Sequence, residues 1–192
     1  FSECTSQGIQ AIVGRSDLLR KISFPKWIIV VSSTITALIN FLINLCVIIV
    51  FALLNGVTPS FTWLLAPLVI LELYLLSLGI AFFLGSINVK YRDISSIWEV
   101  LMQALFYAVP IIYPITMVSA SSVVAAKVLL LNPIAQVIQD ARFLLITDQS
   151  ITVWNYIDNI FLRFLPVLIA LFILTIGSIY FRKHSKYFAE EA

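Results

Sequence analysis

Two long apolar stretches separated by a short charged segment constrain this chain more than any other feature. Residues 61–87 contain one charged side chain, Glu72, and residues 95–117 contain only Glu99. Between them, residues 88–94 read Asn-Val-Lys-Tyr-Arg-Asp-Ile. Because charged side chains are costly in hydrocarbon, this segment, here called the charged turn, must lie at a membrane face. It also offers a polar surface that a soluble partner can bind.

The composition indicates a membrane protein built from helices. Hydrophobic residues make up 61% of the chain and charged residues 11%, and the mean hydropathy is +1.03. A soluble domain has about 25% charged residues. A transmembrane helix needs about 20 apolar residues, and the apolar runs here reach that length. They lack the alternation of a barrel strand. We therefore predict an all-α, polytopic helical membrane protein.

Four apolar segments are long enough to span a membrane. We place these spans at residues 27–54, 61–87, 97–117 and 160–181. A dense turn signal at residues 55–60 makes the first two an antiparallel pair. We assign residues 1–192 to one transmembrane domain. Its other segments are a cytoplasmic helix at 16–22, an extracytoplasmic hairpin at 118–159 and a cytoplasmic tail at 182–192.

The distribution of Lys and Arg predicts the orientation. With four spans, the polar segments alternate between the two sides of the membrane. Nine of the 12 Lys and Arg residues fall in the N-terminal segment, the charged turn and the tail, and the other three are Lys127, Arg142 and Arg163. Since cytoplasmic segments carry the excess of these residues, we expect the N-terminal segment, the charged turn and the C-terminus to be cytoplasmic.

Residues 118–159, the hairpin segment, are long for a loop and rich in aliphatic side chains. Asn132-Pro133 interrupts the segment, and residues 135–146 restart as an amphipathic helix. We expect two short helices, either as a re-entrant hairpin covered by protein or a polar cavity, or as helices that lie on the membrane surface. The polar members of the amphipathic helix are Gln136, Gln139, Asp140 and Arg142.

Glu72 is the one ionisable residue deep in a predicted span, and such residues usually face a cavity or a partner. It can line a polar path, accept a hydrogen bond from Asn40 or Asn44, or lie nearer the outer interface. A stripe of small residues follows it at four-residue intervals and permits close helix packing, within one subunit or between two. The stripe consists of Ser77, Ala81 and Gly85.

Aromatic residues and prolines mark the end of the third predicted span. Tyr107 and Tyr113 are candidates to line a pathway, and Pro110 and Pro114 should kink or break the helix. The sequence gives little support for a catalytic or metal site. No Ser/His/Asp set, paired carboxylates or phosphate-binding loop is visible, and His184 has no second ligand near it. We expect no catalytic, cofactor-binding or metal-binding residue on this chain.

Four short motifs, in order along the whole chain, resemble the ABC-2 type permease family in its polysaccharide-export branch. They are residues 19–25 (Leu-Arg-Lys-Ile-Ser-Phe-Pro), the charged turn with Tyr-Arg-Asp-Ile, residues 110–114 (Pro-Ile-Ile-Tyr-Pro) and residues 131–133 (Leu-Asn-Pro). The tail, residues 181–192, also resembles the ending of that family. Members have about six spans, so the resemblance implies that this chain is an N-terminally truncated fragment.

The resemblance also implies a function. Two permease subunits would form a homodimer around a channel, and the hairpin segment would form its outer gate. Separate ATPase subunits would bind ATP and Mg and drive export of a lipid-linked polysaccharide, such as O-antigen, teichoic acid or capsule. The expected location is the bacterial inner membrane, with no nucleic-acid partner. Residues implied in coupling to the ATPase are Arg20, Lys21, Pro25, Tyr91, Arg92 and Asp93. Residues implied in the channel or gate are Glu72, Tyr107, Pro110, Tyr113, Pro114, Asn132 and Pro133.

Other readings stay open. The same architecture serves ABC-2 exporters of drugs, antibiotics or other small molecules, and no residue distinguishes the substrates. A membrane scaffold without transport is a second alternative, and an intramembrane enzyme is disfavoured because the spans lack a polar cluster. In a purely structural reading, Arg92 anchors the end of one helix and Asp93 caps the next.

Overall fold

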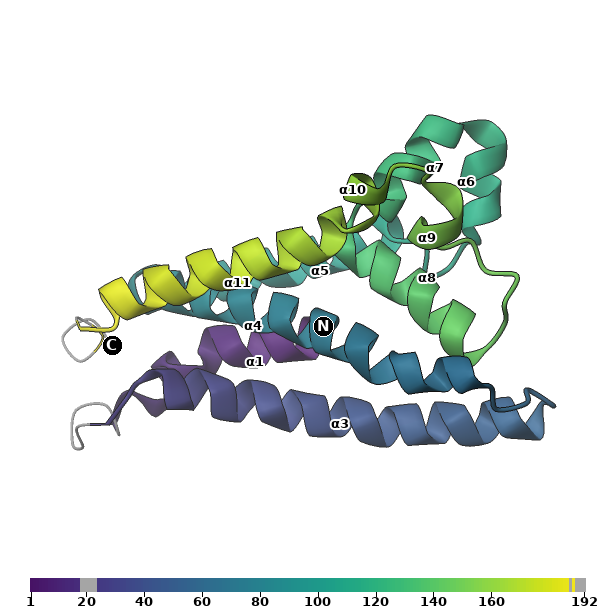
Figure 1. The fold of residues 1–192 in the computed structure, drawn as a ribbon. Coiled ribbons are helices and arrows are strands. Elements are labelled where there is room, and N and C mark those ends of the chain that lie inside the picture. The colour runs from purple at the N-terminus through teal and green to yellow at the C-terminus, as the bar shows by residue number, and fades with distance from the viewer. Residues whose placement is uncertain (18–23, 187, 189–192) are drawn as a thin grey trace. The chain divides into compact units, whose positions relative to one another are not determined.

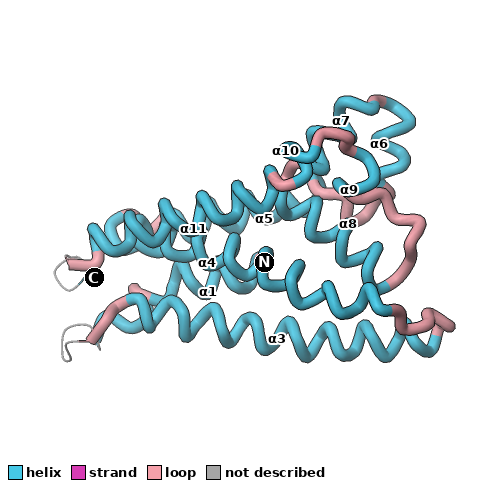
Figure 2. The backbone as a smooth tube through the Cα atoms, viewed as in Figure 1, coloured by secondary structure: helices cyan, strands magenta, loops and turns pink. Residues whose placement is uncertain are grey.

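The computed structural model describes residues 1–17, 24–186 and 188, and every regular element within them is helical (Figures 1 and 2). The all-α prediction is confirmed for this part of the chain. The elements are α1 (Ser2–Ala11), η1 (Val13–Arg15), α3 (Trp27–Leu54), η2 (Phe61–Leu65), α4 (Ala66–Lys90), α5 (Ile94–Ala108), α6 (Ile115–Ser121), α7 (Val123–Leu130), α8 (Pro133–Leu145), α9 (Val153–Tyr156), α10 (Ile160–Arg163) and α11 (Leu165–His184).

The described helices include three that are long and apolar enough to cross a membrane. They are Trp27–Leu54, Phe61–Lys90 and Leu165–His184. A fourth candidate is the bent pair α7 and α8, whose axes meet at 93°. Long apolar helices of this kind satisfy their backbone groups internally, as hydrocarbon requires. The predicted polytopic helical architecture is therefore confirmed, while the membrane side of each end stays a prediction.

Two predicted spans are interrupted, the first at the prolines that were expected to kink or break it and the second at a position that the sequence analysis drew as continuous. In the segment 97–117, α5 has only 15 residues and stops at Ala108. Helix structure resumes at α6, with Pro114 in the preceding extended conformation. In the segment 160–181, a break at Phe164 separates α10 from α11. Proline removes a backbone donor and restricts the residue before it, so α5 ends before Pro110, while Pro114 and Pro166 stand at the starts of α6 and α11.

The chain divides into two compact units. Unit 1 comprises Phe1–Leu42, Tyr74–Gln103 and Leu171–Ala192, and unit 2 comprises Ile43–Leu73 and Ala104–Ala170. Several long helices contribute residues to both units. The candidate coupling residues that the structure describes lie in unit 1, and the candidate gate residues lie in unit 2.

In unit 1, α1 packs against α4 along the small-residue stripe. A Cβ added to Gly8 would overlap the Ala81 side chain, and a Cβ added to Gly85 would lie 3.0 Å from the Gly8 carbonyl oxygen. Ser77 belongs to the same contact, because its side chain lies within hydrogen-bonding reach of Cys4. Of the two readings of this stripe, packing within one subunit therefore describes it. The sequence analysis had treated the α1 segment only as part of a polar N-terminal stretch.

A second close approach in unit 1 joins α4 to α11. A Cβ added to Gly79 would lie 2.6 Å from both the Cα and the nitrogen of Leu174, and one added to Gly177 would overlap the Gly79 carbonyl oxygen. Both glycines are buried. Small residues at such crossings let helix backbones pack directly on one another, which is the main source of helix association in lipid.

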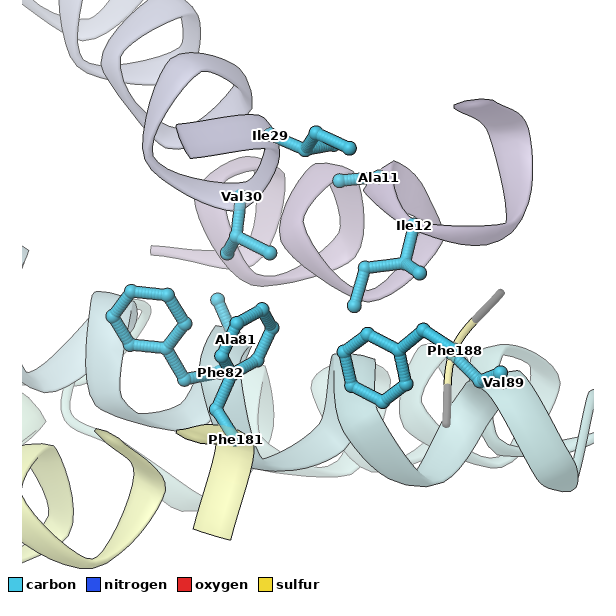
Figure 3. Packing of buried hydrophobic residues seen from close by; sticks show 9 residues of the cluster. All are labelled: Ala11, Ile12, Ile29, Val30, Ala81, Phe82, Val89, Phe181 and Phe188. Atoms are coloured by element: carbon cyan, nitrogen blue, oxygen red, sulfur yellow. The ribbon is translucent and has the colours of Figure 1, made fainter. Parts of the chain in front are cut away.

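The hydrophobic core of unit 1 gathers residues from the start of α3, the end of α4 and the end of α11 (Figure 3). The rings of Phe82 and Phe181 lie 4.9 Å apart, and those of Phe181 and Phe188 lie 5.3 Å apart. Nearby, Lys26 donates a hydrogen bond to the Ser185 carbonyl oxygen and lies over the Phe188 ring. The buried members are Ala11, Ile12, Ile29, Val30, Ala81, Phe82, Val89, Phe181 and Phe188. This core therefore brings the start of α3, the end of α4 and the end of α11 together.

Candidate functional site: a charged turn and a buried polar cluster

The charged turn is a tight connection between two helices. Helix α4 continues to Lys90, and α5 begins at Ile94, whose backbone N–H donates to the Tyr91 carbonyl oxygen at 3.2 Å. Tyr91 is 59% exposed, and Arg92 and Asp93 are exposed as well. Neither charged side chain hydrogen-bonds or pairs with a residue that the structure describes. The turn therefore presents a guanidinium and a carboxylate outward from unit 1.

Helix α1 contacts the residues on both sides of the charged turn. Asn88, just before the turn and buried, donates from its amide to the Ile9 carbonyl oxygen at 3.2 Å. Beyond the turn, the Trp98 indole donates to the Thr5 hydroxyl at 2.9 Å. These contacts hold both helices that flank the turn against one rigid helix. The helices on both sides of the turn are therefore packed into unit 1 through α1.

Of the other coupling candidates, Pro25 lies just before α3 and is exposed. Its carbonyl oxygen accepts the Ile28 backbone N–H at 3.1 Å, so it begins the first helical turn. Arg20 and Lys21 lie outside the described residues, as does most of the predicted helix at residues 16–22.

The aromatic and proline candidates all lie around the break between α5 and α6 in unit 2. Tyr107 is 69% exposed near the end of α5, whereas Pro110 is fully buried. The Tyr113 hydroxyl donates back to the Ala108 carbonyl oxygen at 3.1 Å and so closes the break. Pro114 then sits directly before α6. The break is thus an ordered turn, and of its two tyrosines only Tyr107 is strongly exposed.

Asn132 and Pro133 start α8 in the way their chemistry favours. The Asn132 side-chain oxygen accepts the Ile134 backbone N–H at 3.0 Å, which is a helix N-cap. Pro133 occupies the first turn of the helix, where its missing N–H costs nothing. Together they end α7 and set the start of α8, and the two helices meet at 93°.

Glu72 lies beside the polar face of α8. The Gln136 side chain is within hydrogen-bonding reach of the Glu72 carboxylate, and its amide nitrogen also donates to an Asp140 oxygen at 2.5 Å. The Trp154 side chain is within hydrogen-bonding reach of Asp140. Gln136, Gln139 and Asp140 are only 3%, 2% and 6% exposed. The polar cluster, as we call Glu72, Gln136 and Asp140, is therefore formed inside unit 2.

This cluster bears on two sequence-based expectations. The sequence showed no paired carboxylates and no polar cluster in the spans, yet Glu72 and Asp140 both lie close to the Gln136 side chain. For the amphipathic helix the sequence left open a hairpin covered by protein or a polar cavity, or helices that lie on the membrane surface. In the structure its polar side chains Gln136, Gln139 and Asp140 are buried in the protein. The available signal was the spacing of Gln136, Gln139 and Asp140, which places them on one helix face, together with an unpaired Glu in an apolar run.

Two further contacts anchor α8 within unit 2. The Arg142 guanidinium donates to the Ile111 carbonyl oxygen at 2.8 Å, which ties α8 to the break after α5. The Thr62 hydroxyl donates to the Leu144 carbonyl oxygen at 3.1 Å, which ties the end of α8 to η2. An apolar cluster packs α6, α7 and α9 together and consists of Ile115, Ala126, Leu130, Val153 and Ile157. Helix α8 is thus tied both to the break after α5 and to η2.

Comparison with known proteins shows which proteins the chain resembles. No protein-family model matches the chain. It is, however, 33% identical over 133 residues to the O-antigen export system permease protein RfbA of Myxococcus xanthus, a match that covers 69% of this chain and 51% of the relative. The resemblance to ABC-2 type polysaccharide-export permeases is confirmed.

Two permeases of the same printed name from Klebsiella pneumoniae extend this match. One is 25% identical over 146 residues, covering 74% of this chain and 54% of the relative. The other is 26% identical over 195 residues, covering 99% of this chain and 70% of the relative. The chain thus spans about half the length of the first two relatives. With its apolar helices, this permease-like chain is a multi-pass membrane protein.

Proposed function

We propose that this chain is the transmembrane permease subunit of an ATP-driven exporter that moves a lipid-linked polysaccharide across the bacterial inner membrane. The observation that carries the proposal is the 33% identity, over 69% of the chain, to an O-antigen export system permease. A further relative of the same name matches 99% of the chain. O-antigen, teichoic acid and capsule are the substrate classes that this reading includes.

In this proposal, ATP and Mg bind a separate ATPase subunit, and this chain contributes no cofactor site. The charged turn supports a separate ATPase subunit, because it exposes Arg92 and Asp93 at a short connection that α1 contacts on both sides. Exposed charges of both signs suit a hydrogen-bonded contact with a soluble subunit. A homodimer of permease subunits would enclose the channel, and the C-terminus would be cytoplasmic together with the charged turn.

The first test is association and export. We expect the intact protein to copurify with the ATPase encoded beside its gene. We expect the Arg92→Ala/Asp93→Ala double variant to copurify less ATPase and to export less glycan at unchanged membrane abundance. A matched control is Lys127→Ala/Asp158→Ala, which also removes one cation and one carboxylate but lies in the hairpin segment.

Normal export by the Arg92/Asp93 variant at normal abundance would remove the coupling role from the charged turn. Absence of any copurifying ATPase, with a glycan phenotype also absent on gene deletion, would remove the exporter proposal and favour a scaffold. Accumulation of a drug or antibiotic in the deletion strain, with surface glycan intact, would favour the small-molecule exporter.

A further inference from the structure

We propose that a pocket in unit 2, here called the loop pocket, binds a single uncharged sugar unit, and that the exported glycan supplies this unit. The pocket lies between the connection that follows α3 and the connection that follows α8, and its volume is about 560 Å³. The contacts of unit 2 carry the binding site, and only the source of the sugar rests on the proposed function. The polar lining residues are Asn55, Thr58, Ser60, Thr62, Thr147 and Asp148.

Both walls of the loop pocket are fixed by backbone hydrogen bonds. After α3, Gly56 adopts the left-handed conformation with φ at 84°, and the Val57 N–H donates to the Ala52 carbonyl oxygen at 3.1 Å. A glycine commonly ends a helix and turns the chain in this way. After α8, the Thr147 N–H donates to the Arg142 carbonyl oxygen at 3.0 Å. The polar side chains that follow each helix therefore start from defined backbone positions.

The two walls are also joined to each other. The Thr62 hydroxyl donates to the Leu144 carbonyl oxygen at 3.1 Å, and Ser60 and Thr62 hydrogen-bond to each other. Leu144 is buried near the end of α8, so this contact holds the connection after α3 against that helix. A pocket whose walls are already held together has less freedom to lose when it binds a ligand. This matters most for a ligand as small as one sugar unit.

The lining offers hydrogen-bond donors and acceptors together. The Thr58 hydroxyl and the Asp148 carboxylate are exposed and hydrogen-bond to no residue that the structure describes. The Asn55 amide gives one proton to a carbonyl oxygen in α3 at 2.7 Å and keeps a second proton and its own oxygen. The Thr147 hydroxyl oxygen accepts a backbone N–H at 3.3 Å and can still donate its proton. A sugar hydroxyl both donates and accepts, so it can pair with every one of these groups.

The same lining disfavours other classes of ligand. No Lys, Arg or His is among the described residues of the pocket, so a phosphate or an acidic sugar finds no cation beside the Asp148 carboxylate. A Ca²⁺ ion takes about six to eight oxygen ligands, usually with several carboxylates, and Asp148 is one carboxylate. Apolar side chains such as Phe143 and Ile146 also line the pocket and can pack against the C–H groups of a sugar ring. The volume lies within the range of about 300–1,000 Å³ that is usual for small-molecule sites.

The predicted topology puts the loop pocket on the outer side of the membrane. The connection after α3 joins the first two predicted spans, and residues 147–148 belong to the hairpin segment. Both are therefore extracytoplasmic in the orientation that the Lys and Arg distribution predicts. A sugar unit bound there would belong to a part of the glycan that has already crossed the membrane. In the proposed exporter, we expect the loop pocket to retain this emerging chain.

Saturation-transfer difference NMR of the intact protein in lipid nanodiscs tests the site without an export assay. The probes are methyl glycosides of glucose, galactose, mannose, rhamnose and N-acetylglucosamine, with that of glucuronic acid as the acidic comparison. We expect at least one neutral probe to bind and the acidic probe to bind severalfold more weakly. Asp148→Ala should weaken the neutral probe about tenfold, because it loses a hydrogen bond to a charged group. Thr58→Trp fills the pocket and should abolish binding.

The matched controls are Asp158→Ala and Thr116→Trp, which make the same changes at exposed positions of unit 2 outside the pocket. Both should bind the neutral probe as the parent does. No signal from any neutral probe, or unchanged binding in both pocket variants, would overturn the loop pocket. Equal binding of the acidic probe would overturn the assignment to uncharged sugars. If Thr58→Trp does not fold, Thr58→Val removes the hydroxyl at nearly constant size and should weaken binding severalfold.

The source of the sugar is decided separately. Polysaccharide of the producing strain, released from its lipid by mild acid, should displace the bound neutral probe. Failure to displace it would overturn the glycan as the source. In cells, we expect Thr58→Trp to lower surface glycan severalfold while the ATPase copurifies as before, and normal surface glycan would remove the pocket from export. If deletion of the gene leaves surface glycan intact, the proposed function fails, whereas the NMR results still decide the pocket.

Discussion

The contact between α4 and α11 in unit 1 predicts that Gly79→Ala destabilises the protein. The new methyl carbon would lie 2.6 Å from the Leu174 Cα and nitrogen and 2.9 Å from the Ile173 carbonyl carbon. All three are backbone atoms, so no side-chain rotation relieves the overlap. Since non-bonded carbons pack at about 3.5–4.0 Å, α11 must retreat by about 1 Å along its contact with α4.

The size of the effect follows from two opposing terms. Overpacking of this kind costs about 1–3 kcal/mol, and a clash between two backbones falls in the upper part of that range. Replacing a helical glycine by alanine returns up to about 1 kcal/mol through helix propensity. The expected net loss is therefore about 1–2 kcal/mol, or a fall of about 5 °C in the unfolding midpoint for a chain of this size.

The assay is thermal unfolding of the purified protein in detergent, with Gly14→Ala as the control. A Cβ at Gly14 meets no atom within 4 Å, so this change should be neutral or slightly stabilising. If Gly79→Ala unfolded at the same temperature as Gly14→Ala or higher, the close packing of α4 on α11 would be refuted.

Two further substitutions test local contacts by the same unfolding measurement. Asn132→Ala removes the cap that accepts the Ile134 N–H and should cost about 0.5–2 kcal/mol, whereas Asn132→Ser should retain most of the stability. A full loss in the serine variant would argue against capping. Thr5→Val keeps the shape of a fully buried side chain but removes the acceptor of the Trp98 indole, at an expected cost of about 1 kcal/mol. An unchanged midpoint would show that this hydrogen bond does not brace the charged turn.

Features that depend on neighbouring residues were predictable from the sequence. Asn132 and Pro133 begin a helix because a side-chain acceptor and a fixed φ act within one turn of the chain. The charged turn is an exposed connection because Arg92 and Asp93 cannot enter an apolar environment without partners. Which membrane face it occupies, and whether it contacts an ATPase, are still predictions.

Features that depend on packing between distant segments were not predictable in the same way. For Glu72, the sequence offered Asn40 and Asn44 as partners because they lie in the neighbouring span. The structure places Gln136 of the hairpin segment close to Glu72, since the polar face of α8 turns inward, and Asn40 donates to Glu3. The break between α10 and α11 was likewise missed, because mean hydropathy stays high across it, whereas the break at Pro110 and Pro114 was predicted from the prolines themselves.

By itself, the sequence determined the class of molecule: long uncharged runs require apolar surroundings, and only helices satisfy their own backbone groups there. It also determined where those helices start, break or end at Asn, Pro and charged residues. The tertiary structure decided which faces meet. It paired Gly79 with Leu174, placed α1 against the stripe of Ser77, Ala81 and Gly85, and closed the polar cluster around Gln136. These choices depend on the fit of surfaces far apart in the chain, which periodicity and hydropathy do not encode.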